Sequence, residues 1–219
     1  MKSILTPFQK TILDGICEEK FILDNFTLGG GTALSEFYLK HRYSEDFDFF
    51  TENEIHLENI KIKLDALFNK LKIHSIEYRE IQSSKIFFLK NNQKEVVKTD
   101  FNYFPFFSFN QPTTYKGLKI ESLLDIAVSK LDTILTRKNA RDFIDFYFIQ
   151  KTKNFRLNFL LAKIKEKYNY TVDPLYLGSC FLKIEYLKDY PKMIKKINQE
   201  ELITYFSALS KQQRKKIII

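Results

Sequence analysis

A run of three glycines followed by a threonine, Gly29 to Thr32, constrains the fold of this 219-residue chain more than any other feature. The apolar residues 26–28 before it are typical of a short strand, and the segment TALSEFYLKHR after it carries apolar side chains at helical spacing. Glycine accepts positive φ angles, and the start of a helix offers unpaired N–H groups. The segment therefore predicts a strand, a glycine turn and a helix, an arrangement that can hold a phosphate. A tight turn without a ligand, with Thr32 as a helix cap, is the alternative.

An acidic segment follows the predicted helix. Residues 45–50 alternate between two faces, as a β-strand does, with Asp46 and Asp48 on one face and Phe47 and Phe49 on the other. Two carboxylates this close repel each other unless a cation lies between them, and carboxylate oxygens are the ligands that Mg²⁺ prefers. The pair therefore indicates a site for Mg²⁺, with Mn²⁺ as a substitute. A solvent-facing strand with two ordinary acids is the alternative.

The pattern of the remaining residues divides the chain into an α/β half and a helical half. Beyond the acidic segment, strands are predicted at 76–80, 85–89, 95–102 and near 118–120. Helices are predicted at 7–25, 57–71, 122–135, 140–150, 155–168, 174–187 and 200–209. We place the boundary near residue 112, which gives an N-terminal core, 1–112, and a mainly helical portion, 113–219.

Composition narrows the class of protein. The net charge of +8 favours anionic partners such as nucleotides and RNA. No stretch is apolar enough for a membrane span or a secretion signal, so we expect a cytoplasmic protein without a membrane partner. Cys17 and Cys180 lie in apolar contexts and are expected to be buried free thiols. The histidines are expected at the surface, because none has a neighbour at metal-like spacing: His41, His56 and His74.

Two segments resemble a known family. LGGGTALSEFYLKHRYSEDFDFF resembles the signature of the AbiEii/AbiGii toxin nucleotidyltransferases, which belong to the polymerase-β-like superfamily. SLLDIAVSKLDTILTRKNARDFIDFYFI resembles the second block of that family, so the resemblance covers about residues 26–150. It implies an α+β fold, in which a polymerase-β-like core of mixed sheet and flanking helices precedes a C-terminal helical portion. The first segment matches at Gly30, Gly31, Thr32, Arg42, Ser44, Asp46, Asp48 and Phe49.

The resemblance also implies an activity. Such an enzyme transfers an NMP from an NTP to an acceptor hydroxyl and releases pyrophosphate, often as the toxin of a toxin–antitoxin or phage-defence pair. RNA, with tRNA among the acceptors of relatives, or a protein would receive the NMP, and an antitoxin protein is an expected partner. Asp46 and Asp48 would hold Mg²⁺. Nucleotide phosphates would contact Gly29, Gly30, Gly31, Thr32, Arg42 and Ser44.

Further residues join the expected site through the same resemblance. Asp100 ends the strand at 95–100, where polymerase-β-like enzymes place a third carboxylate that completes the metal site or accepts a proton; a turn-forming aspartate is the alternative. Lys130 projects from an apolar helix stripe, so we expect it to contact a phosphate, with a snorkelling lysine as the alternative. Arg137 follows on nearly the same helix face and is also expected to bind the nucleotide.

The next predicted helix carries Asp142 and Asp145 at i and i+3. The family motif favours Asp142 as the functional acid, while an interhelical ion-pair network is the alternative for these charged residues. We expect the site in the groove between the two portions, with Lys130 and Asp142 on the wall opposite the acidic strand.

Two other functions stay open. An antibiotic-type, small-molecule nucleotidyltransferase uses the same glycine and acid framework but needs an acidic pocket for a cationic acceptor, to which a basic chain is less suited. A non-catalytic nucleotide- or RNA-binding protein of the same fold, or a module neutralised by an antitoxin, is the second alternative.

Overall fold

The chain divides into two compact units, Met1–Ser122 and Leu123–Ile219. The computed structural model describes residues 3–53, 57–82 and 84–215. The division lies later than the predicted boundary near residue 112, because two further strands belong to the first unit. These are β6 (Thr113–Tyr115) and β7 (Leu118–Ile120), and β7 pairs in parallel with the first strand of the sheet.

The first unit is built on a mixed sheet. Within the described residues the sheet has seven strands in the order β3-β4-β5-β2-β1-β7-β6. The strand β2 lies between β1, to which it is antiparallel, and β5, to which it is parallel. The remaining bounds are β1 (Thr27–Gly29), β2 (Asp46–Thr51), β3 (Ser75–Ile81), β4 (Ser84–Lys90) and β5 (Val96–Tyr103). The predicted mixed sheet with flanking helices is confirmed.

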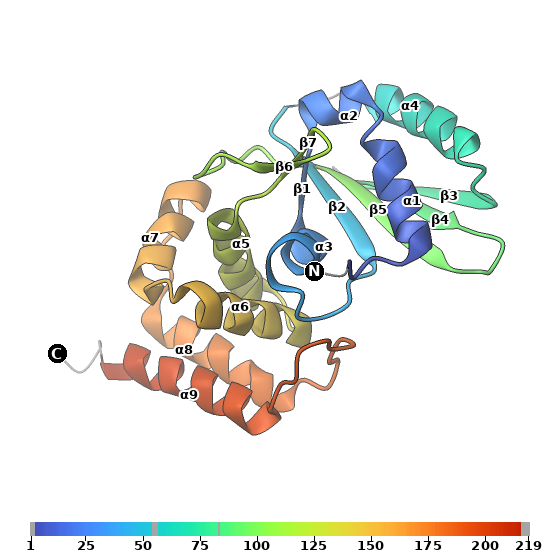
Figure 1. The fold of residues 1–219 in the computed structure, drawn as a ribbon. Helices are drawn as coiled ribbons and strands as arrows, with labels where there is room; N and C mark the ends of the chain where they lie inside the picture. The colour runs from blue at the N-terminus through green and yellow to red at the C-terminus, as the bar shows by residue number, and fades with distance from the viewer. Residues whose placement is uncertain (1–2, 54–56, 83, 216–219) are drawn as a thin grey trace. The chain divides into compact units, whose positions relative to one another are not determined.

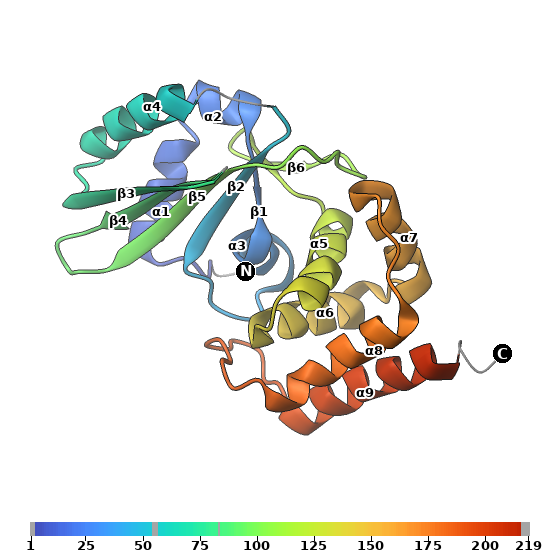
Figure 2. The ribbon, with the colours of Figure 1, turned by 180° about the vertical axis from the view of Figure 1, so that it is seen from behind.

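Helices flank this sheet. Figures 1 and 2 show α1 and α4 together on one side of it, and Gly15 of α1 lies against Leu71 at the end of α4. The helix predicted over 7–25 is interrupted, so that α1 (Pro7–Ile16) and α2 (Lys20–Asn25) are separate. A capping box of Thr6 and Gln9 starts α1. The other helices are α3 (Gly30–Ala33), the π-helix η1 (Leu34–Leu39) and α4 (Leu57–Lys70).

Phenylalanine side chains fill the space between the sheet and these helices. Phe49 of β2 stacks on Phe101 of β5, with ring centroids 4.8 Å apart, and both are buried. Phe68 of α4 meets Phe87 of β4 at 5.6 Å. Because side chains alternate along a strand, the residues on either side of Phe49 project from the opposite face of the sheet.

The second unit is helical. Phe206 of the last helix contacts Phe143 at 5.0 Å and Phe181 at 5.6 Å, which joins three helices in one apolar core. A buried ion pair between Lys167 and Asp125, 3.1 Å long, connects two of the helices. The elements are α5 (Leu123–Thr136), α6 (Ala140–Lys153), α7 (Leu157–Tyr168), α8 (Pro174–Leu182), the 3₁₀ helix η2 (Lys183–Tyr186) and α9 (Gln199–Lys215).

Other expectations concern burial. The two cysteines are free and buried, as predicted. His41 is fully buried, so its predicted surface position is wrong; His74 is exposed, and His56 lies outside the described residues.

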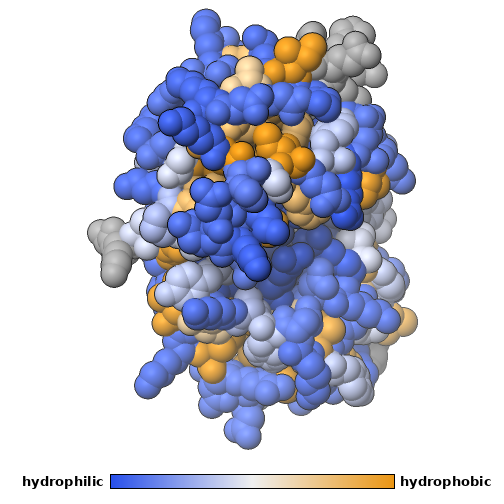
Figure 3. Space-filling view, turned by 90° about the vertical axis from the view of Figure 1, so that its right-hand side faces the viewer, coloured by the Kyte–Doolittle hydropathy of each residue, from blue (hydrophilic) through white to orange (hydrophobic). Residues whose placement is uncertain are grey.

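In the part of the chain that the structure describes, no helix is both long and apolar enough to cross a membrane. Hydrophilic residues cover most of the face drawn in Figure 3.

The buried pair of α5 and α7 generates a prediction about stability. Replacing Lys167 with methionine leaves Asp125 in the core without this ammonium, and we expect the free energy of unfolding in urea to fall by about 3–5 kcal/mol. Lys163→Met on the same helix removes a partly exposed pair with Glu166 and is expected to cost below about 1 kcal/mol. Equal losses for the two variants would contradict a structural role for the buried pair.

Candidate active site

The glycine turn lies directly against the acidic strand. Gly29 is the register partner of Asp48, so the turn begins beside that carboxylate. Gly30 has φ +67°, a left-handed conformation that favours glycine. A Cβ atom at Gly30 would collide with Oδ2 of Asp48, and one at Gly31 would collide with Nη2 of Arg42 and lie 3.2 Å from Oγ of Ser44. The structure thus brings together the predicted glycines, Arg42, Ser44 and Asp48.

Thr32 has a structural contact at this turn. Its side chain is fully buried, and its hydroxyl donates to the carbonyl oxygen of Asp46. This hydrogen bond fixes the start of the helix to β2, and α3 has no side-chain cap, so the alternative role of Thr32 as a helix cap is wrong. A contribution of Thr32 to nucleotide binding stays a prediction.

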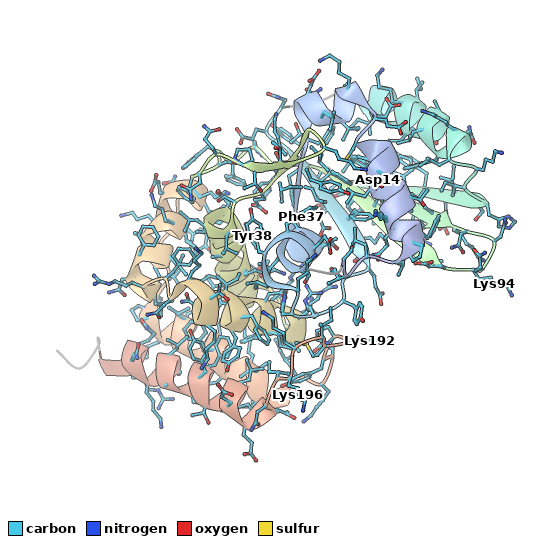
Figure 4. All side chains as sticks on the ribbon, in the orientation of Figure 1. Asp14, Phe37, Tyr38, Lys94, Lys192 and Lys196 are labelled. Atoms are coloured by element: carbon cyan, nitrogen blue, oxygen red, sulfur yellow. The ribbon has the colours of Figure 1, made fainter. Side chains whose placement is uncertain are left out.

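The helical segment after the turn is also held in place. Figure 4 labels Phe37 and Tyr38 on this segment. The ring of Phe37 lies 5.3 Å from that of Tyr115, and the hydroxyl of Tyr38 donates to the carbonyl oxygen of Glu121 at 2.8 Å. Both partners lie near the end of the sheet to which β6 and β7 belong, so these strands help to orient the turn.

Arg42 places a buried positive charge beside the turn. Its side chain is 4% exposed, and Nη1 donates to the carbonyl oxygen of Tyr43 at 2.9 Å. Gln9 of α1 donates through Nε2 to the carbonyl oxygen of Ser44 at 2.8 Å, which holds the segment between Arg42 and β2. The sequence did not single out Gln9, although its place in the capping box at the start of α1 marked it as a polar residue with a fixed orientation.

The carboxylates come from two adjacent strands. Asp46 and Asp48 are half-buried while Phe47 and Phe49 are fully buried, which confirms the predicted alternation. In the parallel register of β2 and β5, Asp48 is the partner of Asp100. The sequence predicted both strands, but only the pairing of β2 with β5 brings the third carboxylate beside the first two.

Asp100 is a buried acid whose negative charge and hydrogen-bonding capacity are only partly satisfied by its neighbours. Burial raises its pKa above the ordinary value, more than the neighbouring Lys98 ammonium lowers it, and the charge of Asp46 raises it further. Lys98 donates to Oδ2 of Asp100, whereas Oδ1 is buried without a hydrogen-bond partner. A buried carboxylate oxygen without a donor is costly, and a cation beside it would remove that cost.

The donor set fits a divalent cation in its chemistry. All three acids offer the carboxylate oxygens that Mg²⁺ and Mn²⁺ bind, and Asp100 has an unpartnered oxygen. As the side chains stand, however, the described residues contain no cluster of three acidic, histidine or cysteine side chains arranged to hold a metal ion. The ammonium of Lys98 contacts Asp100 instead. The sequence did not reveal that Lys98 pairs with Asp100, although the alternation of residues along the strand puts both side chains on the same face.

The predicted site residues of the second unit form a cluster of their own. Lys130 is buried and pairs with Asp142 at 2.9 Å and with Asp145 at 2.7 Å, while Arg137 donates to both oxygens of Asp142 at 2.8 and 3.1 Å. This is the interhelical ion-pair network that the sequence left open as an alternative. Lys130 does not snorkel to solvent, and two aspartates already balance its charge. A role for Lys130 and Asp142 in catalysis, and for Lys130 and Arg137 in nucleotide binding, stays a prediction.

This cluster makes stability depend on pH. Burial raises the pKa of Asp142, but Lys130 and Arg137 outweigh burial, and the folded-state pKa lies below the ordinary 3.8. The resulting stabilisation is present above about pH 4 and is lost as the pH falls through the folded-state pKa. We expect Asp142→Asn to lower the free energy of unfolding at pH 7 and to lose less further stability between pH 5 and pH 3 than the wild type. Parallel pH curves from urea denaturation would contradict this assignment.

Comparisons of the sequence with known proteins identify a family. The family described as nucleotidyl transferase AbiEii toxin, type IV toxin–antitoxin system, matches residues 11–209. An uncharacterized protein of Aquifex aeolicus (strain VF5) is 29% identical over 167 residues, which cover 73% of this chain and 71% of that protein.

Solved structures share the fold. JHP933 from Helicobacter pylori has a TM-score of 0.58 at 20% identity, with 94% of this chain and 89% of that chain covered. MenT4, a nucleotidyltransferase toxin from Mycobacterium tuberculosis H37Rv, has a TM-score of 0.50 at 12% identity, with 94% and 86% covered. Since the family match spans most of the sequence, this chain belongs to the AbiEii family of nucleotidyltransferase toxins of type IV toxin–antitoxin systems.

Proposed function

We propose that this enzyme transfers an NMP from an NTP to an acceptor hydroxyl of RNA, with tRNA as the first candidate, in a reaction that depends on Mg²⁺. The observation that carries the proposal is the packing of the Gly30 turn against Asp48, whose strand partner is Asp100. This arrangement puts backbone N–H groups, a buried arginine and three carboxylates at one end of β1 and β2. A cognate antitoxin is the protein partner that family membership implies.

In this proposal, different residues of the first unit bind the metal and the phosphates. Asp46 and Asp48 would hold Mg²⁺, with Asp100 either completing that site or accepting the proton of the attacking hydroxyl at Oδ1. Held by these acids, Mg²⁺ would supply positive charge to neutralise the triphosphate and to activate the attacking hydroxyl. The N–H groups of the glycine turn, together with Arg42 or Ser44, bind and orient the β- and γ-phosphates. Fixed donors of this kind stabilise the charge that develops in transfer without further reorganisation.

Charge on the second unit supports RNA over a small cationic acceptor. The carboxylate of Asp189 accepts hydrogen bonds from the backbone N–H of Ala140 at 3.2 Å, which fixes the segment before α9 to the start of α6. Figure 4 labels Lys192 and Lys196 in this segment. The exposed cations of the two joined regions are Arg137, Lys138, Arg141, Lys188, Lys192, Lys195 and Lys196. A basic surface attracts a polyanion and repels a cationic antibiotic.

The acidic strand provides the direct test of the activity. We expect purified wild-type protein with Mg²⁺, radiolabelled NTP and total RNA to label RNA, and the Asp46→Ala/Asp48→Ala variant to lose this transfer while it stays folded by circular dichroism. Glu45→Ala, which removes an exposed acid next to the strand, is the matched control and should keep its activity. Equal labelling by the wild type and the double variant would exclude this site.

The same assay separates the alternative functions. Label on a small molecule in a cell extract, with none on RNA, would identify an antibiotic-type enzyme. Nucleotide binding without any Mg²⁺-dependent transfer would identify a non-catalytic binding protein.

A pair of glycine variants tests the turn. Gly30→Ala and Gly117→Ala both put a side chain at positive φ, at a cost of about 1–2 kcal/mol each, but only at Gly30 does the new Cβ collide with the Asp48 carboxylate. At Gly117 the first contact is with Leu23 at 3.4 Å. We expect Gly30→Ala to lower transfer about a hundredfold, because the carboxylate is displaced, and Gly117→Ala to keep activity near that of the wild type. Similar activities for the two variants would contradict a functional role for the close approach.

A further inference from the structure

Lys98 occupies a distinctive place among the site acids. It lies on β5 two residues before Asp100, so both side chains project from the same face, and its register partner on β2 is Asp46. Its ammonium is in direct contact with Asp100. The ammonium therefore lies in the field of all three carboxylates.

The charges of this cluster do not balance. Three carboxylates at neighbouring positions on β2 and β5 repel one another, and a single ammonium offsets only part of that repulsion. The compensation is also one-sided, because Lys98 contacts Oδ2 of Asp100 while Oδ1 is buried without a partner. This arrangement leaves a net negative charge and one carboxylate oxygen without a partner, and a divalent cation would compensate both.

We propose that Lys98 is the internal counter-ion of this site: its ammonium holds Asp100 when no metal is bound, and a divalent cation must compete with it for that carboxylate. The proposal rests on the proposed function, in which these acids bind Mg²⁺. This role of Lys98 explains why the three acids lie on adjacent strand positions although the described residues contain no cluster of side chains arranged to hold a metal ion. Lys98 is accordingly a positioning residue that sets the affinity for metal.

The test compares two lysine variants in the metal-free enzyme. Lys98→Met removes the ammonium from the acid cluster, whereas Lys90→Met removes the same charge from β4 of the same sheet, at a position whose partner on β5 is Val96. Mn²⁺ binding is measured by isothermal titration calorimetry without nucleotide. We expect the Kd for Mn²⁺ to fall on the order of tenfold in Lys98→Met, because a positive charge no longer opposes the ion. In Lys90→Met we expect a change of less than about twofold, because the register partners of Lys90, Ser75 and Val96, carry no charge.

Thermal unfolding without metal provides a second readout. We expect Lys98→Met to lower the Tm of the metal-free protein and Asp100→Asn to restore part of that loss in the double variant, because the neutral amide no longer repels Asp46 and Asp48. Saturating Mn²⁺ should raise the Tm of Lys98→Met by more than that of the wild type. If Lys98→Met does not fold, Lys98→Gln removes the charge with a polar side chain and carries the same expectations.

The outcomes separate this inference from the proposed function. A Kd for Mn²⁺ in Lys98→Met that is unchanged or higher, beside wild-type binding that Asp48→Asn abolishes, would overturn the counter-ion role and leave the metal assignment standing. Wild-type protein that binds no Mn²⁺, or binds it equally well in Asp48→Asn, would overturn both.

Discussion

The close approach of the Gly30 backbone to the Asp48 carboxylate is the constraint on which the rest of the site depends. A Cβ atom at Gly30 would collide with a carboxylate oxygen of Asp48 and force it to shift, and the positive φ there favours glycine. Gly31 allows the same closeness to Arg42. Where the backbone N–H groups of a turn meet both an acid and a base, a phosphate and its metal can be bound together.

The position of Asp48 is itself a consequence of the hydrophobic core. Phe47 and Phe49 are fully buried on one face of β2, and the stack of Phe49 on Phe101 fixes β2 against β5. Because side chains alternate, burying these rings directs Asp48 and Asp100 to the opposite face. A shift of β2 by one residue would bury the acids and expose the aromatics, so the energy of the core holds the register of the site.

Buried charges in the two units are compensated to different degrees. Lys130 has two aspartate partners and Asp142 has two basic partners, which makes that cluster self-sufficient. In the first unit, Asp100 has one lysine and an unpartnered oxygen. Complete pairing is typical of a structural network, whereas incomplete pairing of buried groups is costly and is retained where a ligand completes it.

The sequence by itself determined the local features: the glycine turn, the alternation of Asp46 and Asp48, and most helices and strands to within a few residues. Each depends on neighbours in the chain, which periodicity reports directly. Only the tertiary structure decided that β5 lies beside β2, that Lys98 neutralises Asp100, and that Lys130 is balanced by two aspartates. Periodicity shows which face a side chain occupies but not which distant strand or helix packs against it, because that choice follows from burying the whole core at once.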